Sequence, residues 1–161
     1  MVIGQENIAL SISIEWWQRY QDLLKQAVAP LTVDQLAFRL GSQRSAGEIA
    51  AHIVAVRAWY LQGVMGEGGA EIEPLRGWDA LGAPPRTSTE LLTGIDQTWQ
   101  LLTTCLARWT ATDMRGTFFI NWRDHDESRA WIVWHMLEHE IHHGGELSFT
   151  LGSFGLPGVD V

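Results

Sequence analysis

The chain has 161 residues, 46% of them hydrophobic, and this content suits one compact domain with its own core, spanning 1–161. Its formal net charge is −8, and its 11 lysines and arginines are scattered. It therefore lacks the basic stripe that nucleic acid or an anionic membrane surface would need. The first residues do not resemble a secretory signal, and no apolar run reaches the roughly 18 residues of a membrane span. We expect a cytoplasmic protein that binds neither nucleic acid nor membranes.

Two long helical segments are predicted in the first half of the chain. Apolar residues recur at helical spacing from Ile8 to Val28, and this segment stops before a proline. A short turn of helix is expected within 31–40. The second long segment opens at Ser45 with an S-x-x-E capping box and continues towards Gly66. The stretch 66–86 that follows is rich in glycine and proline, which indicates a long crossover loop within one domain.

Two further helical segments are predicted in the second half. The third begins with another capping box at Thr87 and extends to about Trp109. The fourth runs from about Ser128 to Leu151 and ends at a glycine. The connection between them contains one short extended piece, Phe118 to Ile120, and one piece is too little for a sheet. We therefore predict an all-α four-helix bundle.

Histidines crowd the fourth segment, which holds four of the six in the chain between residues 135 and 143. His139 and His143 are four residues apart, so on a helix they stand one turn above each other, with Cβ atoms about 5–6 Å apart. The apolar side of the second segment offers one more imidazole, His52. By itself His52 also fits a core histidine bonded to a hydroxyl or carbonyl group. Together the three predict a bundle-core site for one divalent metal ion, whether nickel, zinc or iron.

Several neighbours of this triad are candidates for supporting or pocket roles. His135 lies one turn before His139 and is expected at the wall of the pocket. His142 points about 60° away from His139 on the helical wheel and suits a bond to a nearby carboxylate. Glu146 either holds a ligand imidazole or faces solvent. Trp59 is either a core residue or an aromatic wall for an apolar ligand.

Some sequence features have a second explanation. The fourth segment also matches H-E-x-x-H, the zincin protease pattern, with Glu140 as general base. Zincins need a third ligand downstream, however, and residues 144–161 contain no histidine, so we disfavour a protease. Glu48 is assigned to the capping box and Cys105 to the core. His125 is expected in a solvated loop.

The stretch S-A-G-E-I-A-A-H-I at 45–53 and the stretch W-H-M-L-E-H-E-I-H-H-G-G-E at 134–146 together resemble the DinB-like superfamily, also called YfiT-like. The ending L-G-S-F-G-L-P-G at 151–158 extends the resemblance over nearly the whole chain. It implies an up-down-down-up four-helix bundle, often a dimer, that holds a divalent ion on three histidines. The positions that match these ligands are His52, His139 and His143.

Relatives with an assigned activity are thiol S-transferases that use low-molecular-weight thiols such as bacillithiol or mycothiol. The resemblance thus implies that a metal ion activates a small-molecule thiol, which attacks an electrophile. Many relatives carry Arg-Gly-Gln after the last ligand, whereas this chain has Gly144-Gly145-Glu146, so that arginine has no counterpart here. Two other functions stay open: a metal-containing binding or stress-response protein without catalysis, and a metal-dependent hydrolase. The nine tryptophans also suggest a homodimer.

Overall fold

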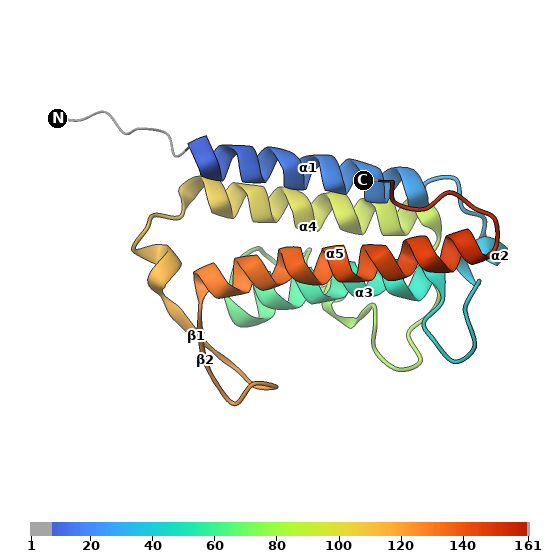
Figure 1. The fold of residues 1–161 in the computed structure, drawn as a ribbon. Coiled ribbons are helices and arrows are strands. Elements are labelled where there is room, and N and C mark those ends of the chain that lie inside the picture. The colour runs from blue at the N-terminus through green and yellow to red at the C-terminus, as the bar shows by residue number, and fades with distance from the viewer. Residues whose placement is uncertain (1–7, 161) are drawn as a thin grey trace.

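Four long helices lie side by side in the computed structural model, which describes residues 8–160 and, of the side chains, those from residue 13 onward (Figure 1). They are α1 (Ile8–Val28), α3 (Ala46–Ala58), α4 (Ser88–Arg108) and α5 (Arg129–Ser153). Helix α3 contacts both α4 and α5, and α1 contacts α4. The predicted, mainly helical architecture is therefore confirmed.

Side-chain caps explain where the helices begin. The hydroxyl of Ser45 accepts a hydrogen bond from the backbone N–H of Glu48, and the Glu48 carboxylate accepts one from the backbone N–H of Ser45. Thr87 and Glu90 form the same reciprocal pair before α4, and a third capping box precedes the short helix α2 (Val33–Leu36). Each box satisfies backbone donors that the first helical turn leaves free. The predicted starts and the capping role of Glu48 are confirmed.

The second helix does not stay α-helical up to Gly66, as its apolar pattern suggested. It changes at its C-terminal end into a π-helix, η1 (Trp59–Val64), which packs against the 3-10 helix η2 (Glu73–Gly77) of the crossover loop. Short π-helical turns inside α-helices often occur at functional sites because they shift side chains out of the regular register. Here the shift affects Trp59 and the residues that follow it.

A small hairpin corrects the expectation of a single extended piece. Strand β1 (Thr117–Ile120) pairs antiparallel with β2 (His125–Ser128), after the short 3-10 helix η3 (Asp113–Arg115). The sequence of β2 is His-Asp-Glu-Ser, which has no apolar alternation and therefore carries no strand signal. His125 thus lies in a strand and not in a loop, although its side chain is about half exposed, as expected.

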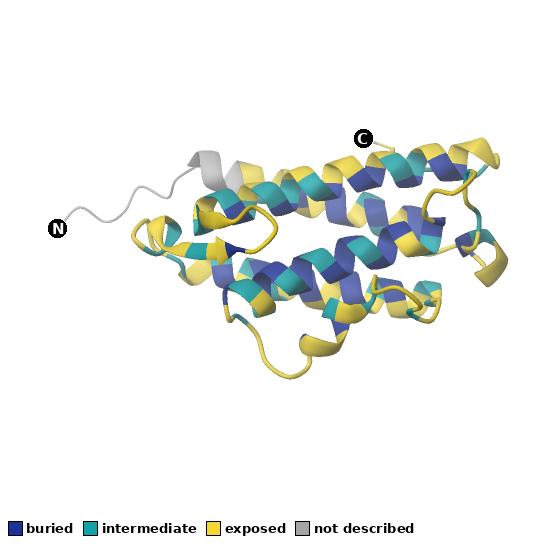
Figure 2. Cartoon of the chain, turned by 90° about the horizontal axis from the view of Figure 1, so that it is seen from below, coloured by how far each residue is buried: buried dark blue, intermediate teal, exposed yellow. Residues whose placement is uncertain are grey.

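Each long helix carries buried residues, dark blue in Figure 2, and most of the buried residues are apolar. Leu24, Ile53 and Leu147 belong to one cluster, and Leu102 and Met136 belong to another. The thiol of Cys105 is buried, as predicted. Among the described helices, none combines the length and apolarity that crossing a membrane would require. The two histidine-bearing helices, α3 and α5, therefore pack directly against each other over an apolar core.

Candidate metal centre

The structure brings His52 of α3 together with His139 and His143 of α5. The Nε2 atoms of His52 and His139 are 3.1 Å apart, and one ring nitrogen from each of the three residues lies within 4.8 Å of the others. The three ring centroids are 4.2 to 4.8 Å apart. His143 is buried, and the other two are partly buried. These three residues are the ones that the sequence proposes as a triad.

Two carboxylates hold the outer nitrogens of the triad. The Nδ1 atom of His52 lies 2.6 Å from Oδ2 of Asp79, and that of His143 lies 2.6 Å from Oε2 of Glu146. An ionised carboxylate can only accept, so each Nδ1 carries the proton and each Nε2 keeps a free lone pair. Histidines that bind metals usually have such a partner, which fixes the tautomer and the direction of the ring. Glu146 therefore has the imidazole-holding role considered for it.

Burial favours the neutral form of the two triad histidines on α5, His139 and His143. Loss of hydration is the larger cause, and repulsion of a second positive charge by the nearby rings of His143 and His52 adds to it; together they lower the pKa of His139 to about 3. Burial also lowers the pKa of His143, although the Glu146 carboxylate opposes this effect. Only a neutral imidazole can donate a lone pair to a metal. His139 and His143 are thus in the protonation state that a cation needs at neutral pH.

The donor set fits a divalent transition-metal ion. Two imidazole nitrogens bound to one ion at the usual 2.0–2.1 Å, with bond angles between octahedral and tetrahedral values, are about 2.8–3.4 Å apart. The 3.1 Å separation of the His52 and His139 nitrogens falls within that range. Three neutral imidazoles suit zinc, nickel and iron alike. The cluster can therefore hold a divalent ion, and its donors do not select one metal.

A pocket of about 380 Å³ opens beside the triad, with His139 in its wall. His135 and Trp59 also line it, as considered from the sequence. The ring of His135 stacks on Trp131 with centroids 4.7 Å apart, so the histidine is held as part of an aromatic wall. Trp134, in contrast, is 60% exposed and does not line this pocket.

The comparisons with known proteins agree with this architecture. The family profile of the DinB superfamily matches residues 17–147, which is most of the chain. The chain belongs to the DinB superfamily. A search of the curated proteins found no match.

Solved structures of DinB-like proteins share the fold. One from Bacillus cereus has a TM-score of 0.68 at 16% identity, with 91% of this chain and 93% of that chain covered. The DinB-like protein YjoA of Bacillus subtilis has a TM-score of 0.63 at 15% identity, with 92% of this chain and 95% of that chain covered. A protein assigned to the DinB family from Exiguobacterium sibiricum has a TM-score of 0.60 at 17% identity, with 88% of this chain and 91% of that chain covered. The TM-scores support a common fold, and the low identities say nothing about a common substrate.

The Glu140 carboxylate of this DinB protein is engaged by side chains other than the three histidines. Its carboxylate accepts hydrogen bonds from Trp17 Nε1 at 2.8 Å, Gln21 Nε2 at 2.6 Å and Arg57 Nε at 2.7 Å. The Glu140 side chain is buried, as are those of Gln21 and Arg57. A carboxylate saturated by buried donors is not available as a general base. The zincin interpretation of the H-E-x-x-H pattern therefore fails on its base as well as on its third ligand.

His142 has a peripheral place in this DinB fold. Its Nε2 lies 3.3 Å from Oε1 of Glu146, the same carboxylate that holds His143. Most of its side chain is exposed. The supporting role considered for His142 is therefore limited to this contact with Glu146. His142, His143 and Glu146 also form a second group of potential ligands, but it is more exposed than the triad.

Asp79 and Arg76 are site residues that the sequence did not point to, and it did not point to the buried Arg57 that pairs with Glu140. Asp79 and Arg76 lie in the crossover loop, and Asp79 is 27 residues away from the histidine that it holds. Arg57 was hidden because a charged residue in a helix is normally solvated, whereas this one is 1% exposed. Its position on the apolar face of α3, five residues after His52, was the one available signal.

Proposed function

We propose that this protein binds one divalent metal ion through His52, His139 and His143 and acts as a thiol S-transferase on a low-molecular-weight thiol. The observation that supports this most directly is the convergence of three histidine ring nitrogens, two of them 3.1 Å apart. Three protein ligands leave a coordination position open, as in catalytic metal sites, whereas structural zinc sites are closed by four. The up-down-down-up order of the four long helices is also part of this proposal, and the course of the ribbon in Figure 1 supports it.

The residues around the triad would prepare the site for this chemistry. When bound, the ion would lower the pKa of a thiol and so supply a thiolate nucleophile near neutral pH. Asp79 and Glu146 orient the ring nitrogens of His52 and His143, and the aromatic wall beside His139 excludes water from one side. In the transfer, the thiol loses its proton, the sulfur forms a bond to an electrophilic carbon, and the leaving group departs with the electrons of its broken bond.

Metal analysis tests the first half of the proposal. The purified protein should contain about one divalent ion per chain, and changing His52, His139 or His143 to Ala should remove it. His125→Ala is the matched control because this histidine lies in the exposed hairpin strand β2. Full metal retention in a variant with all three histidines changed to Ala would contradict the assignment of the ligands.

Thiol consumption tests the second half. The metal-loaded protein should consume a thiol and an electrophile such as a chlorinated aromatic compound in equal amounts, and the metal-free protein should not. Metal binding without consumption over a broad panel of thiols would instead favour a binding or stress-response protein without catalysis. Metal-dependent cleavage of an ester or amide without thiol would favour a hydrolase, for which the buried Glu140 is unavailable as base.

The cellular setting is part of the same proposal. We place the protein in the cytoplasm, where low-molecular-weight thiols are abundant, with small molecules and a second copy of the chain as its partners. Exposed apolar side chains on α5, among them Trp134, Ile141 and Phe149, support self-association. Analytical ultracentrifugation over a range of concentrations would test the dimer, and a monomer at every concentration would exclude it.

A further inference from the structure

An unpaired positive charge lies in the pocket beside the triad. Arg76 of η2 lines this pocket together with His139. Its Nη1 atom donates to Oε1 of Gln62 at 2.7 Å, while its buried Nε atom has no partner. Among residues 13–160, no carboxylate forms an ion pair with Arg76. An arginine without a counter-charge in a pocket is a strong donor that is available to an anion.

Residues of the π-helix η1 position this guanidinium group. Gly63 lies so close to it that a Cβ atom there would be 3.2 Å from Arg76 Nε and 3.3 Å from both Arg76 Cζ and Trp59 Cδ1. A larger residue at position 63 would therefore displace both the arginine and the tryptophan. Gln62, next along η1, supplies the hydrogen bond to Nη1. Two consecutive residues of an irregular helical turn thus hold the charge beside the aromatic wall.

The rest of the pocket is apolar and aromatic. Trp59, Tyr60 and the hairpin residue Trp122 line it, together with Val56. Asp79 is the one carboxylate among the lining residues, and its Oδ2 is already bonded to His52. Asp79 thus faces His52 and forms no ion pair with Arg76, so the guanidinium has no carboxylate partner among the described lining residues. A volume of about 380 Å³ suits a small organic molecule.

We propose that this pocket binds a small carboxylate-bearing compound, whose carboxylate contacts Arg76 and whose apolar part lies against Trp59 and Trp122, next to the triad. The inference rests on the proposed function in one respect, because it makes this compound a reactant of the transfer. The reactant is either the thiol or the electrophile, and the carboxylate is the chemistry common to both. A planar carboxylate matches the fork of guanidinium donors.

Binding of matched acids and amides tests the inference. Phenylpropionate and other aryl-alkanoates should bind to the full-length protein about ten-fold or more tightly than their neutral amides in isothermal titration calorimetry, the usual effect of one charged hydrogen bond. Arg76→Met keeps the apolar stem and should abolish the preference for the acid, and so should Arg76→Gln. Circular dichroism checks that each variant folds. Two neutral variants are used so that, if one folds poorly, the other still tests the inference.

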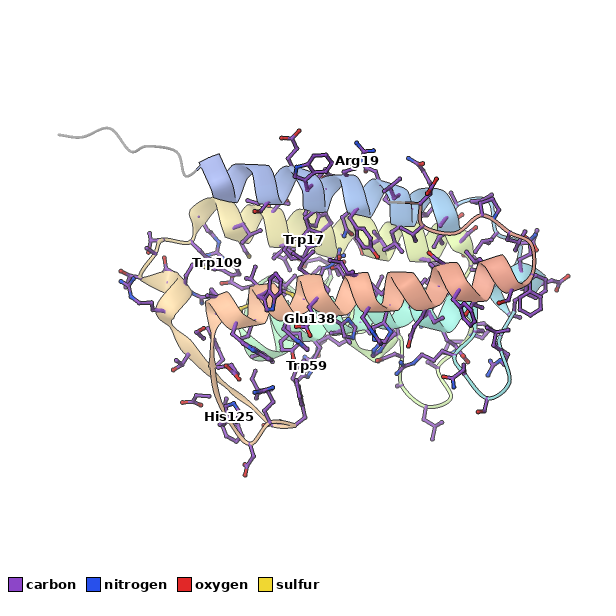
Figure 3. All side chains as sticks on the ribbon, in the orientation of Figure 1. Trp17, Arg19, Trp59, Trp109, His125 and Glu138 are labelled. Atoms are coloured by element: carbon purple, nitrogen blue, oxygen red, sulfur yellow. The ribbon has the colours of Figure 1, made fainter. Side chains whose placement is uncertain are left out.

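Arg19→Gln is the control, because Arg19 projects from α1 on the opposite side of the bundle from Trp59 (Figure 3). It should leave the preference intact. If no acid in the panel binds better than its amide, or if the preference survives in the folded Arg76 variants, the inference is overturned. A purely structural role for Arg76 would alter stability but not the ratio of acid to amide affinity.

The same titrations on metal-free and metal-loaded protein separate this inference from the proposed function. If the protein binds no metal but prefers acids through Arg76, the carboxylate site is supported and the proposed function is contradicted. If the protein binds metal through the triad but shows no preference for acids over amides, only the carboxylate site is contradicted. With the active protein, a carboxylate effect on KM for mercaptopropionate against mercaptoethanol would identify the thiol as the ligand. The same effect for chloronitrobenzoate against its amide would identify the electrophile, and no effect in either pair would overturn the assignment to a reactant.

Discussion

Arg57 and Glu140 form a buried ion pair that joins α3 to α5, the two helices on which the three histidines lie. Each residue is 1% exposed, and Gln21 of α1 donates to the carboxylate and accepts from the guanidinium. Glu140 directly follows His139, and Arg57 comes five residues after His52. The pair therefore fixes the separation of the two helices at the level of the triad.

Breaking this pair should destabilise the protein strongly. Glu140→Gln leaves the Arg57 charge buried without a counter-charge, and we expect the free energy of unfolding to fall by about 3–5 kcal/mol. Urea denaturation followed by circular dichroism measures it. Asp96→Asn breaks the exposed Lys25–Asp96 pair and should cost less than about 1 kcal/mol. Equal losses in the two variants would contradict the prediction.

The pair should also show energetic coupling. Replacing both partners by apolar residues, Arg57→Met with Glu140→Leu, should cost less than the sum of the two single changes, because neither charge is then left alone. Additive losses would mean that the surrounding hydrogen bonds, and not the ion pair, carry the stability.

Asp79 should raise the affinity of the triad for metal. Asp79→Asn removes the charge that holds Nδ1 of His52, and we expect affinity to fall about 10- to 100-fold, the usual effect of losing such a partner. Competition with a chromophoric chelator measures this. Asp126→Asn, on the exposed side of β2, should leave the affinity unchanged. If both variants bind like the native protein, the carboxylate has no role at the metal.

Gly144 and Gly145 should respond to alanine in opposite ways. A Cβ atom at Gly144 would lie 1.8 Å from the hydroxyl oxygen of Tyr20, whereas one at Gly145 would meet nothing within 4 Å. We expect Gly144→Ala to cost about 1–3 kcal/mol through overpacking. Gly145→Ala should add up to about 1 kcal/mol of stability, since alanine favours the helix. In a Tyr20→Phe background the cost of Gly144→Ala should shrink, and an unchanged cost would remove the clash as its cause.

The two tyrosines should resist ionisation at alkaline pH. Burial, with a smaller effect of the Glu140 charge, raises the pKa of Tyr20 to about 12, and burial also raises the pKa of Tyr60. Near-ultraviolet absorbance should therefore show little tyrosinate at pH 10 in the folded protein and about half ionisation after unfolding.

The same shift predicts how stability depends on pH. The folded protein holds the Tyr20 proton more tightly than the unfolded chain, so the contribution is complete below pH 10 and is lost as pH rises towards about 12. Tyr20→Phe should flatten this part of the stability curve in alkaline denaturation experiments. An unchanged curve would assign the loss to other groups.

Much of the fold and the triad could be predicted because the signals are local. A capping box spans four residues, and the one-turn relation of His139 to His143 follows directly from helical geometry. Even His52 could be found, since it is the one imidazole in a helix that is otherwise almost entirely apolar. The hairpin could not, because β2 is polar and is a strand only through its pairing with β1.

The amino-acid sequence by itself determined where the helices begin, which faces are apolar and which imidazoles point inward, because backbone hydrogen bonding and side-chain periodicity act over a few residues. Only the tertiary structure decided that Asp79 holds His52, that Arg57 neutralises Glu140 and that Arg76 lines the pocket beside the triad. These contacts join residues of separate elements. Such partners depend on how the helices and the crossover loop pack, and no spacing along the chain encodes that packing.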